Sequence, residues 1–143
     1  MTENLFGHNT NESTPPRAVL QTQRAKLLPV LESTKSLYKL WHEYHTTLPK
    51  IHRYSLGSKI DSLFIELIES LAVATFLSKD EKLPFVRIGI RKLDTLNILL
   101  LILFETKSLD TKKYITVSEK TNEIGKMLGG WHGQLIKQKD IKN

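Results

Sequence analysis

The stretch NEIGKMLGGWHGQ, residues 122–134, holds four of the chain's seven glycines and one of its two tryptophans. Gly125 and Gly129 are four residues apart, which places them on one face of a helix. Because they lack a Cβ, they would let another helix or an aromatic ring approach closely, and Gly129 or Gly130 would end the helix in the left-handed conformation. Trp131 would then pack against the preceding turn. The stretch therefore predicts a helix end suited to close packing.

The same glycines do not form a nucleotide-binding loop. A P-loop requires Gly-x-x-x-x-Gly-Lys followed by Ser or Thr, whereas Lys126 precedes Gly129 and no Ser or Thr follows. A dinucleotide loop requires Gly-x-Gly-x-x-Gly, and Leu128 occupies the place of the first glycine. Both loops also follow a strand, whereas a helical pattern precedes these glycines. We therefore expect no phosphate-binding loop here.

Helical periodicity extends outward from this stretch over residues 33–131. Apolar residues recur every three or four positions in four segments, which is typical of amphipathic helices. We expect the first helix to end at Pro49, Ser55 to cap the second, and the third to run from Pro84 to Lys107. Short links between four such helices predict an all-α, antiparallel up-down four-helix bundle. The apolar positions outside the third helix are Leu37, Leu40, Trp41, Tyr44, Leu48, Ile60, Leu63, Phe64, Leu67, Leu71, Ala74, Tyr114, Val117, Ile124, Leu128 and Trp131.

The chain of 143 residues is long enough for one domain with a core, and it contains no cysteine. Disulfides and thiolate zinc sites are therefore excluded, and a reducing cytoplasm is the expected compartment. We interpret residues 1–32 as a disordered or weakly structured N-terminal tail, residues 33–131 as the bundle, and residues 132–143 as a polar, basic C-terminal tail. The first thirty residues lack a basic segment followed by an apolar one, so no signal peptide is expected.

The net positive charge lies outside the predicted N-terminal tail, residues 1–32, where three basic and three acidic residues cancel. The net charge is +6, and residues 33–143 carry all of it, with 18 Lys/Arg and 12 Asp/Glu. Such a surface favours polyanions, although ordinary solvated lysines are the alternative for many positions. Few aromatic residues lie near the basic groups, so we expect binding that follows the backbone rather than sequence-specific reading of single strands. The candidate nucleic-acid or partner-binding residues are Lys50, Arg53, Lys59, Arg87, Arg91, Lys92, Lys112, Lys113, Lys120 and Lys126.

Arg87 and Arg91 are the strongest of these candidates. They are four residues apart on one predicted helix face, and an arginine fork fits phosphate or carboxylate bidentately.

The predicted third helix contains a run of seven apolar residues and is therefore apolar on every side. Seven residues are far fewer than the ~20 needed to cross a bilayer. The run is either the most buried helix of the bundle or one whose outer face forms a subunit interface, and we favour the interface. The candidate interface residues are Ile98, Leu99, Leu100, Leu101, Ile102, Leu103 and Phe104.

No constellation of residues indicates an enzyme. His42 and His45 are three residues apart, one short of the HExxH zinc spacing, and are better interpreted as polar residues beside an apolar stripe. No glutamate has a histidine three residues later, as a di-iron bundle would require. There is also no Gly-x-Ser-x-Gly nucleophile motif. We expect no catalytic residue, no metal and no cofactor.

Four segments together resemble a known bundle family: RYSLGSKI (53–60), SKDEKLPF (78–85), KLDTLNILLLI (92–102) and NEIGKMLGGW (122–131). In this order, over about residues 38–131, the chain is similar to the four-helix-bundle proteins that include the accessory variability determinant (Avd) of diversity-generating retroelements. The same family includes proteins encoded in intervening sequences of bacterial 23S ribosomal RNA genes.

The resemblance implies a ring-shaped homo-oligomer, a homopentamer, whose basic surface binds RNA and DNA with little sequence preference. It also implies a partner, the reverse transcriptase of the element, which the accessory protein assists in mutagenic cDNA synthesis. The alternative is a structural or protein-binding oligomer of the ribosomal RNA intervening-sequence type, without a nucleic-acid function. Neither interpretation involves a membrane.

Overall fold

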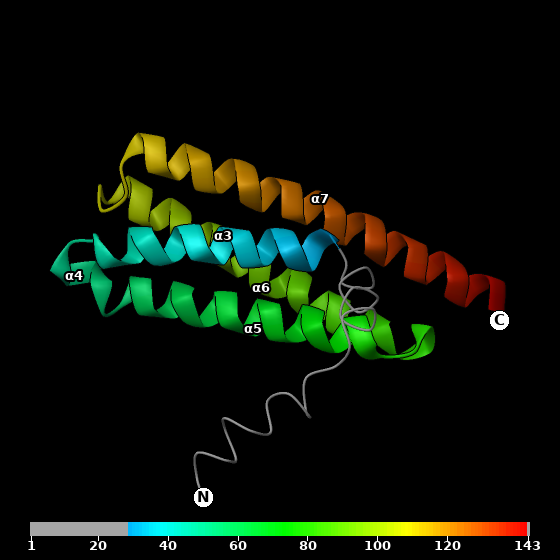
Figure 1. The fold of residues 1–143 in the computed structure, drawn as a ribbon. Helices are drawn as coiled ribbons and strands as arrows, with labels where there is room; N and C mark the ends of the chain where they lie inside the picture. Colours follow the sequence, from blue (N-terminus) through cyan, green and yellow to red (C-terminus); the bar gives the residue numbers. More distant parts are fainter. Residues whose placement is uncertain (1–28, 143) are drawn as a thin grey trace, which may run out of the picture.

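The fold is an antiparallel bundle of four long helices, with one short helix in the first connection (Figure 1). The structure is a computed structural model and describes residues 29–142. Over these residues it contains no strand, and the predicted four-helix bundle is confirmed. In chain order the helices are α3 (Pro29–Thr46), α4 (Lys50–Arg53), α5 (Leu56–Phe76), α6 (Lys79–Glu105) and α7 (Thr111–Lys142).

Neighbouring helices enclose one long apolar core. Helix α5 packs beside α3 and α6, and α7 packs beside the same two, so α3 and α6 lie diagonally across the bundle. The predicted apolar stripes face this core, with Trp41 and Phe64 fully buried at its centre. Their rings stack at a centroid distance of 6.0 Å. Burial of these stripes is the main stabilising contribution to such a bundle, since isolated helices of this length are marginal in water.

The first helix begins earlier than the sequence predicts. Helix α3 starts at Pro29, a residue suited to the first turn of a helix, and Val30 and Leu31 are buried in the core. The bundle therefore includes residues 29–32, which the sequence analysis assigns to the tail. The remainder of that predicted tail, residues 1–28, lies outside the described residues.

The start of α6 is also earlier than predicted, because Pro84 lies inside the helix and not at its beginning. The residues before this proline are held in helical form by contacts with α5. Leu83 is buried beside Ala74, and the Lys82 ammonium donates to the carbonyl oxygens of Ala74 (2.5 Å) and Thr75 (3.1 Å). Burial of the ammonium lowers the pKa of Lys82. These contacts stabilise the turn although Pro84 removes one backbone hydrogen bond.

Helix α7 contradicts the predicted helix end at residues 129–130. It continues through all four glycines of the opening stretch to Lys142, and none of them has a positive φ. A Cβ at Gly125 would lie 3.6 Å from Leu93 Cδ2, an ordinary contact, and one at Gly129 would meet nothing within 4 Å. The predicted close approach is therefore absent. Leu135, farther along, is buried in a cluster with Ala74 of α5 and Leu83 and Val86 of α6, which favours continuation of the helix.

The turn between α6 and α7 contains the one non-glycine residue with positive φ among the described residues. This residue is Lys107, with φ 67°. It follows the last helical turn, where the N–H groups of Ser108 and Leu109 donate to the carbonyl oxygen of Leu103. Glycine usually occupies this position, because the left-handed conformation costs a residue with a Cβ about 1 kcal/mol.

The apolar run of α6 divides between the core and the surface. Leu100 and Leu103 are buried in the core of the single chain, whereas Ile98 (59% exposed) and Leu101 (38% exposed) face outward. Leu99 and Ile102 are half-buried, and Phe104 stacks on Tyr114 of α7 at a centroid distance of 4.5 Å. The run is therefore not enclosed by its own bundle. The interface stays a prediction, and it now rests on Ile98 and Leu101 rather than on all seven residues.

Candidate nucleic-acid interface

The two arginines of α6 lie on its solvent-facing side, as the sequence analysis predicts for a binding pair. Arg87 and Arg91 are both exposed and one helical turn apart. The Arg87 Nε–H donates to His132 Nε2 of α7 at 3.3 Å. This contact connects α6 to α7 and orients one guanidinium, while neither arginine forms an ion pair in the described part of the chain. The guanidinium of Arg91 and the two Nη groups of Arg87 are therefore available to an anion.

Lys92 lies beside the two arginines in sequence but has a different environment. Its ammonium forms an ion pair with Glu66 of α5, with 2.8 Å between Nζ and Oε1. The hydrogen bond from Lys92 lowers the pKa of the Glu66 carboxyl below its usual range. The pair is partly exposed, so its contribution to stability is small. Lys92 connects α5 to α6 and is less available to a phosphate than its neighbours.

Arg53 has a structural role that the sequence analysis does not identify. Its guanidinium donates from Nε and Nη2 to the carbonyl oxygen of Leu48, at 3.2 and 3.0 Å. Its own carbonyl oxygen accepts a hydrogen bond from His45 Nε2 at 2.9 Å. The residue thus ties α4 to the end of α3. At least two of the five N–H groups of Arg53 are already engaged, which leaves fewer of them for an anion. Anion binding by Arg53 stays a prediction.

The remaining predicted lysines lie on two parts of the surface. Lys50, Lys59 and Lys112 are exposed around the end of the bundle formed by α4 and the α6–α7 turn. Lys113 belongs to the same end, where its ammonium donates to Thr47 Oγ1 (3.2 Å) and lies 5.4 Å from the centroid of the Tyr44 ring. The structure thus gathers residues from positions 50–59 and 112–113 that are far apart in sequence.

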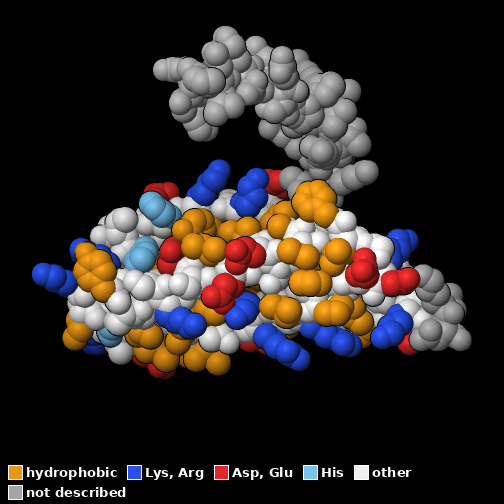
Figure 2. Space-filling view, turned by 90° about the horizontal axis from the view of Figure 1, so that it is seen from below, with side chains coloured by type: hydrophobic (Ala, Val, Ile, Leu, Met, Phe, Trp, Pro, Cys, Tyr) orange, Lys and Arg blue, Asp and Glu red, His pale blue; other side chains and the backbone are white. Residues whose placement is uncertain are grey.

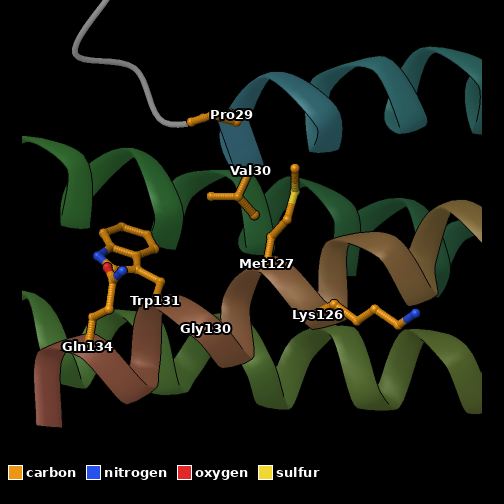
Figure 3. Close-up of a pocket in the computed structure, with 7 residues that line it drawn as sticks. All are labelled: Pro29, Val30, Lys126, Met127, Gly130, Trp131 and Gln134. Atoms are coloured by element: carbon orange, nitrogen blue, oxygen red, sulfur yellow. The ribbon is translucent and has the colours of Figure 1, made fainter. Parts of the chain in front are cut away.

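Lys120 and Lys126 extend along the exposed side of α7. Lys126 also lines a cavity of about 320 Å³ between the start of α3 and the glycine-rich part of α7 (Figure 3). The side chains of Val30, Met127 and Trp131 face one another there, and Figure 3 shows the Lys126 side chain extending away from them. The cavity is thus lined mainly by apolar groups and has no pair of titratable groups suited to acid–base chemistry.

His42 and His45 do not come together as a metal site. The His45 ring stacks on Trp41 at a centroid distance of 5.3 Å, and its Nε2 is already engaged with the Arg53 carbonyl. His42 packs edge-on against Tyr38, with centroids 6.3 Å apart. Within residues 29–142, no group of three or more His, Asp or Glu side chains is placed to hold a metal ion. His45 is thus a packing residue of α3, whereas His42 is exposed and contacts only the edge of a neighbouring ring.

Apolar side chains share the surface with the charged groups. Figure 2 shows the α5 side of the bundle, where orange apolar side chains lie along the face and blue Lys or Arg and red acidic side chains are interspersed with them. The most exposed large apolar residues are Ile51, Tyr54 and Phe76, at 77%, 72% and 70%. Ile51 lies in a short link, where a single apolar residue carries no periodic signal that would mark it as a functional candidate. Phe76 ends α5, and the contact of His132 with Arg87 joins residues that are far apart in sequence, so the local pattern marks neither of them.

Among the described helices, none combines the length and the apolar composition that a transmembrane segment needs.

The family model described as bAvd-like matches residues 28–135, which is most of the chain and all of the bundle core. The chain belongs to the bAvd-like family. No curated protein and no solved structure matches this chain.

Membership of the bAvd-like family confirms the resemblance to the Avd group of four-helix-bundle proteins. The four sequence segments that carry the resemblance map to defined parts of the fold. RYSLGSKI forms the α4–α5 junction, SKDEKLPF begins α6, KLDTLNILLLI is the second half of α6, and NEIGKMLGGW is the middle of α7. The family supports an accessory, non-catalytic type of protein at this level.

Proposed function

We propose that this bAvd-like protein is a non-enzymatic accessory protein that binds RNA and DNA through its basic surface. In this proposal it assists a retroelement reverse transcriptase in mutagenic cDNA synthesis. The observation that carries the proposal is the exposed pair Arg87 and Arg91 on α6 of a chain from this family. Two guanidinium forks one turn apart suit two neighbouring phosphates, and contacts of this kind hold a protein on nucleic acid without reading its sequence.

The double variant Arg87→Ala/Arg91→Ala should bind RNA more weakly, with a less steep dependence of affinity on salt. Each lost phosphate contact removes roughly one unit from the slope of log K against log salt, so two lost contacts remove about two units. Fluorescence anisotropy with a labelled oligonucleotide over a salt series measures both quantities. An unchanged slope and affinity would exclude the pair from the binding surface.

The matched control is Lys35→Ala/Lys39→Ala. These lysines are exposed, have the same i, i+4 spacing and remove the same charge, but they lie on α3, diagonally across the bundle from α6. A general loss of positive charge would weaken binding equally in both double variants. If the arginines contact phosphate directly, the α6 double variant should lose more RNA affinity than the α3 double variant.

The alternative function is a structural or protein-binding oligomer whose charge only aids solubility. The outward-facing Ile98 and Leu101 favour assembly in either case, because exposed apolar clusters commonly mark protein interfaces. We include a homo-oligomer in the proposal for this reason, and its ring shape and pentameric number are what the resemblance to the Avd proteins implies. Absence of binding to any nucleic acid at low salt would favour the alternative.

The reverse transcriptase belongs to the proposal as a partner. A reverse transcriptase gene beside this one, together with a template repeat and a variable repeat, would support it. Co-purification of the two proteins from cells that express both would test the contact directly. Failure to co-purify, with nucleic-acid binding intact, would limit the proposal to the nucleic acid.

A further inference from the structure

The end of the bundle formed by residues 47–59 and 105–113, which we call the α4 end, presents two apolar side chains to solvent. Ile51 and Tyr54 are the two most exposed large apolar residues among those described. They lie three residues apart around the C-terminal end of α4, at the end of the molecule opposite to the C-terminus (Figure 1). Large apolar side chains exposed to this degree have no role in the core of the single chain, which raises the question of what they contact.

These side chains stand on a firmly held segment. Arg53 bonds to Leu48 and His45, as described above. His52 Nδ1 lies 2.5 Å from Ser108 Oγ in the α6–α7 turn, and Ser55 Oγ donates to the carbonyl oxygen of Ile51 at 3.0 Å. The segment is thus fixed to both connections at this end of the bundle. A contact surface preorganised in this way loses little entropy when it binds.

The α4 end is strongly basic. It contains six Lys or Arg residues and two Asp or Glu residues, and its first part, residues 47–59, has no acidic residue. Tyr54 lies among these cations, with the Arg53 guanidinium 5.9 Å from the centroid of its ring. Figure 2 shows apolar and basic side chains side by side at this end, on the left of the view. The surroundings of the ring therefore match an anionic partner in charge.

Lys107 adds a second, independent sign that this end is adapted for binding. It holds the left-handed conformation that glycine adopts more easily, and its neighbour Ser108 contacts α4 through His52. The exposed lysine adds a cation to the α4 end in spite of the backbone strain. Strained residues of this kind persist where the surrounding structure fixes them, and they cluster at functional sites.

We propose that the α4 end binds single-stranded RNA or DNA, with Tyr54 stacking on an unpaired base and the lysines around it contacting the flanking phosphates. A base has a π face regardless of its identity, so this contact adds affinity without sequence preference. Arg53 lies toward the Tyr54 ring, so the base would stack on the side that Arg53 leaves free. Bases in a duplex are already stacked, so the contact favours single strands. The inference rests on the proposed function and adds a class of ligand and a site to it.

A protein partner fits the α4 end less well. Stable protein interfaces bury about 800 Å² on each side and have an apolar centre from which charged residues are depleted. Here two apolar side chains stand among six cations, which is the reverse composition. The pattern of one aromatic ring with several surrounding cations is typical of single-strand binding.

The variant Tyr54→Ala should bind a labelled single-stranded oligonucleotide roughly five- to 100-fold more weakly than the unchanged chain, measured by fluorescence anisotropy. Tyr54→Phe keeps the ring and should bind the single strand within about twofold of the unchanged chain. Tyr54→Ala should bind a duplex of the same length within about twofold of the unchanged chain, because the bases there are already stacked. The matched control is Phe76→Ala, since Phe76 is similarly exposed but lies at the other end of α5, where the following helix begins with the acidic residues Asp80 and Glu81. It should leave single-strand binding unchanged. Thermal unfolding should be the same for all three variants.

The salt dependence separates stacking from charge. Tyr54→Ala should lower the affinity without changing the slope of log K against log salt, because no phosphate contact is lost. Lys50→Ala/Lys107→Gly should instead reduce the steepness of that slope by about 1.4 units, because each phosphate contact with a single strand contributes about 0.7. Lys107→Gly should also raise the melting temperature, because glycine relieves the left-handed strain. An unchanged slope in this double variant would overturn the phosphate contacts.

Failure of this inference is distinguishable from failure of the proposed function. Equal single-strand affinity of Tyr54→Ala and the unchanged chain would overturn the inference alone, and so would an equal loss for single strands and duplexes. Loss of reverse transcriptase binding in Tyr54→Ala, with single-strand affinity intact, would also overturn it and assign the surface to protein. If the unchanged chain binds no nucleic acid at low salt, both proposals fail.

Discussion

Leu100→Glu should unfold the bundle, because the side chain at this position is 1% exposed and lies in the core of the single chain. Removal of a buried leucine costs roughly 2–5 kcal/mol, and burial of a carboxylate without a partner adds several kcal/mol more. The total is comparable with the whole stability of a small domain, about 5–15 kcal/mol. Circular dichroism should show lost helicity or a strongly lowered melting temperature. A native melting curve would contradict the core position of Leu100.

Ile98→Glu is the matched change two residues earlier in the same apolar run. Ile98 is 59% exposed, so the glutamate would reach solvent and the bundle should keep its helicity and melting temperature within a few degrees. If the outer face of α6 is a subunit interface, the mass measured by light scattering should fall toward that of one chain. A folded variant with unchanged oligomeric mass would remove Ile98 from the interface. The pair thus separates folding from assembly.

The sequence predicts the core of this fold well because helical spacing is redundant. Each stripe is marked by several residues, so an error at one position does not change the face that is buried. The run of α6 is the exception, since seven consecutive apolar residues show no periodicity. Its buried side follows only when the helical spacing of Leu93 and Leu96 is continued into the run. Four residues after Leu96 comes Leu100 and three residues later Leu103, and these are the two buried positions of the run.

Helix ends were predicted less well, because they depend on contacts between distant residues. Pro84 and the glycines at 129–130 are local signals for a helix start and a helix end, and both are overridden. Leu83 is buried on one side of Pro84, and Leu135 is buried after the glycines. Local preferences of about 1 kcal/mol per glycine and about 3 kcal/mol for proline are offset by the burial of such side chains, about 1.5–3 kcal/mol each, together with the contacts that continue along the helix.

The cations of the candidate site follow from the sequence, but their contacts do not. Sequence identifies which residues are cationic, and the exposure of Arg87 and Arg91 agrees with their assignment to one accessible helix face. It does not show which cations are already engaged. The contact of Arg53 with Leu48 and that of Lys92 with Glu66 depend on loop geometry and on the packing of α5 against α6. The position of Tyr54 among cations from two connections likewise appears only in three dimensions.

Gly57→Ala should destabilise the fold, because the RYSLGSKI segment has no space for a Cβ at this position. Gly57 is buried, and a Cβ there would lie 2.9 Å from His45 Cδ2 and Nε2 and 2.9 Å from Leu48 Cδ1. These side chains cannot move freely, since His45 is stacked on Trp41 and bonded to the Arg53 carbonyl, and Leu48 is buried. Overpacking of this kind costs about 1–3 kcal/mol.

Gly129→Ala is the matched control and should have the opposite sign. Gly129 is also helical, but a Cβ there would meet nothing within 4 Å. Alanine is favoured over glycine inside a helix by about 1 kcal/mol, and no contact opposes that gain. Thermal and urea unfolding of both variants should therefore bracket the unchanged chain, with Gly57→Ala less stable and Gly129→Ala more stable.

The two glycine variants also test the division of this chain into a packed junction and an open helix face. If Gly57→Ala were as stable as the unchanged chain, α5 would not lie as close to His45 and Leu48 as described. The hydrogen bonds of Arg53 with these two residues, which hold α4, would then also be in doubt. If Gly129→Ala were destabilising instead, the α7 surface would have to contact something outside the single chain, such as a second subunit. In that case, dilution of the protein should reduce the destabilisation, because a lost subunit contact depends on concentration whereas strain within one chain does not.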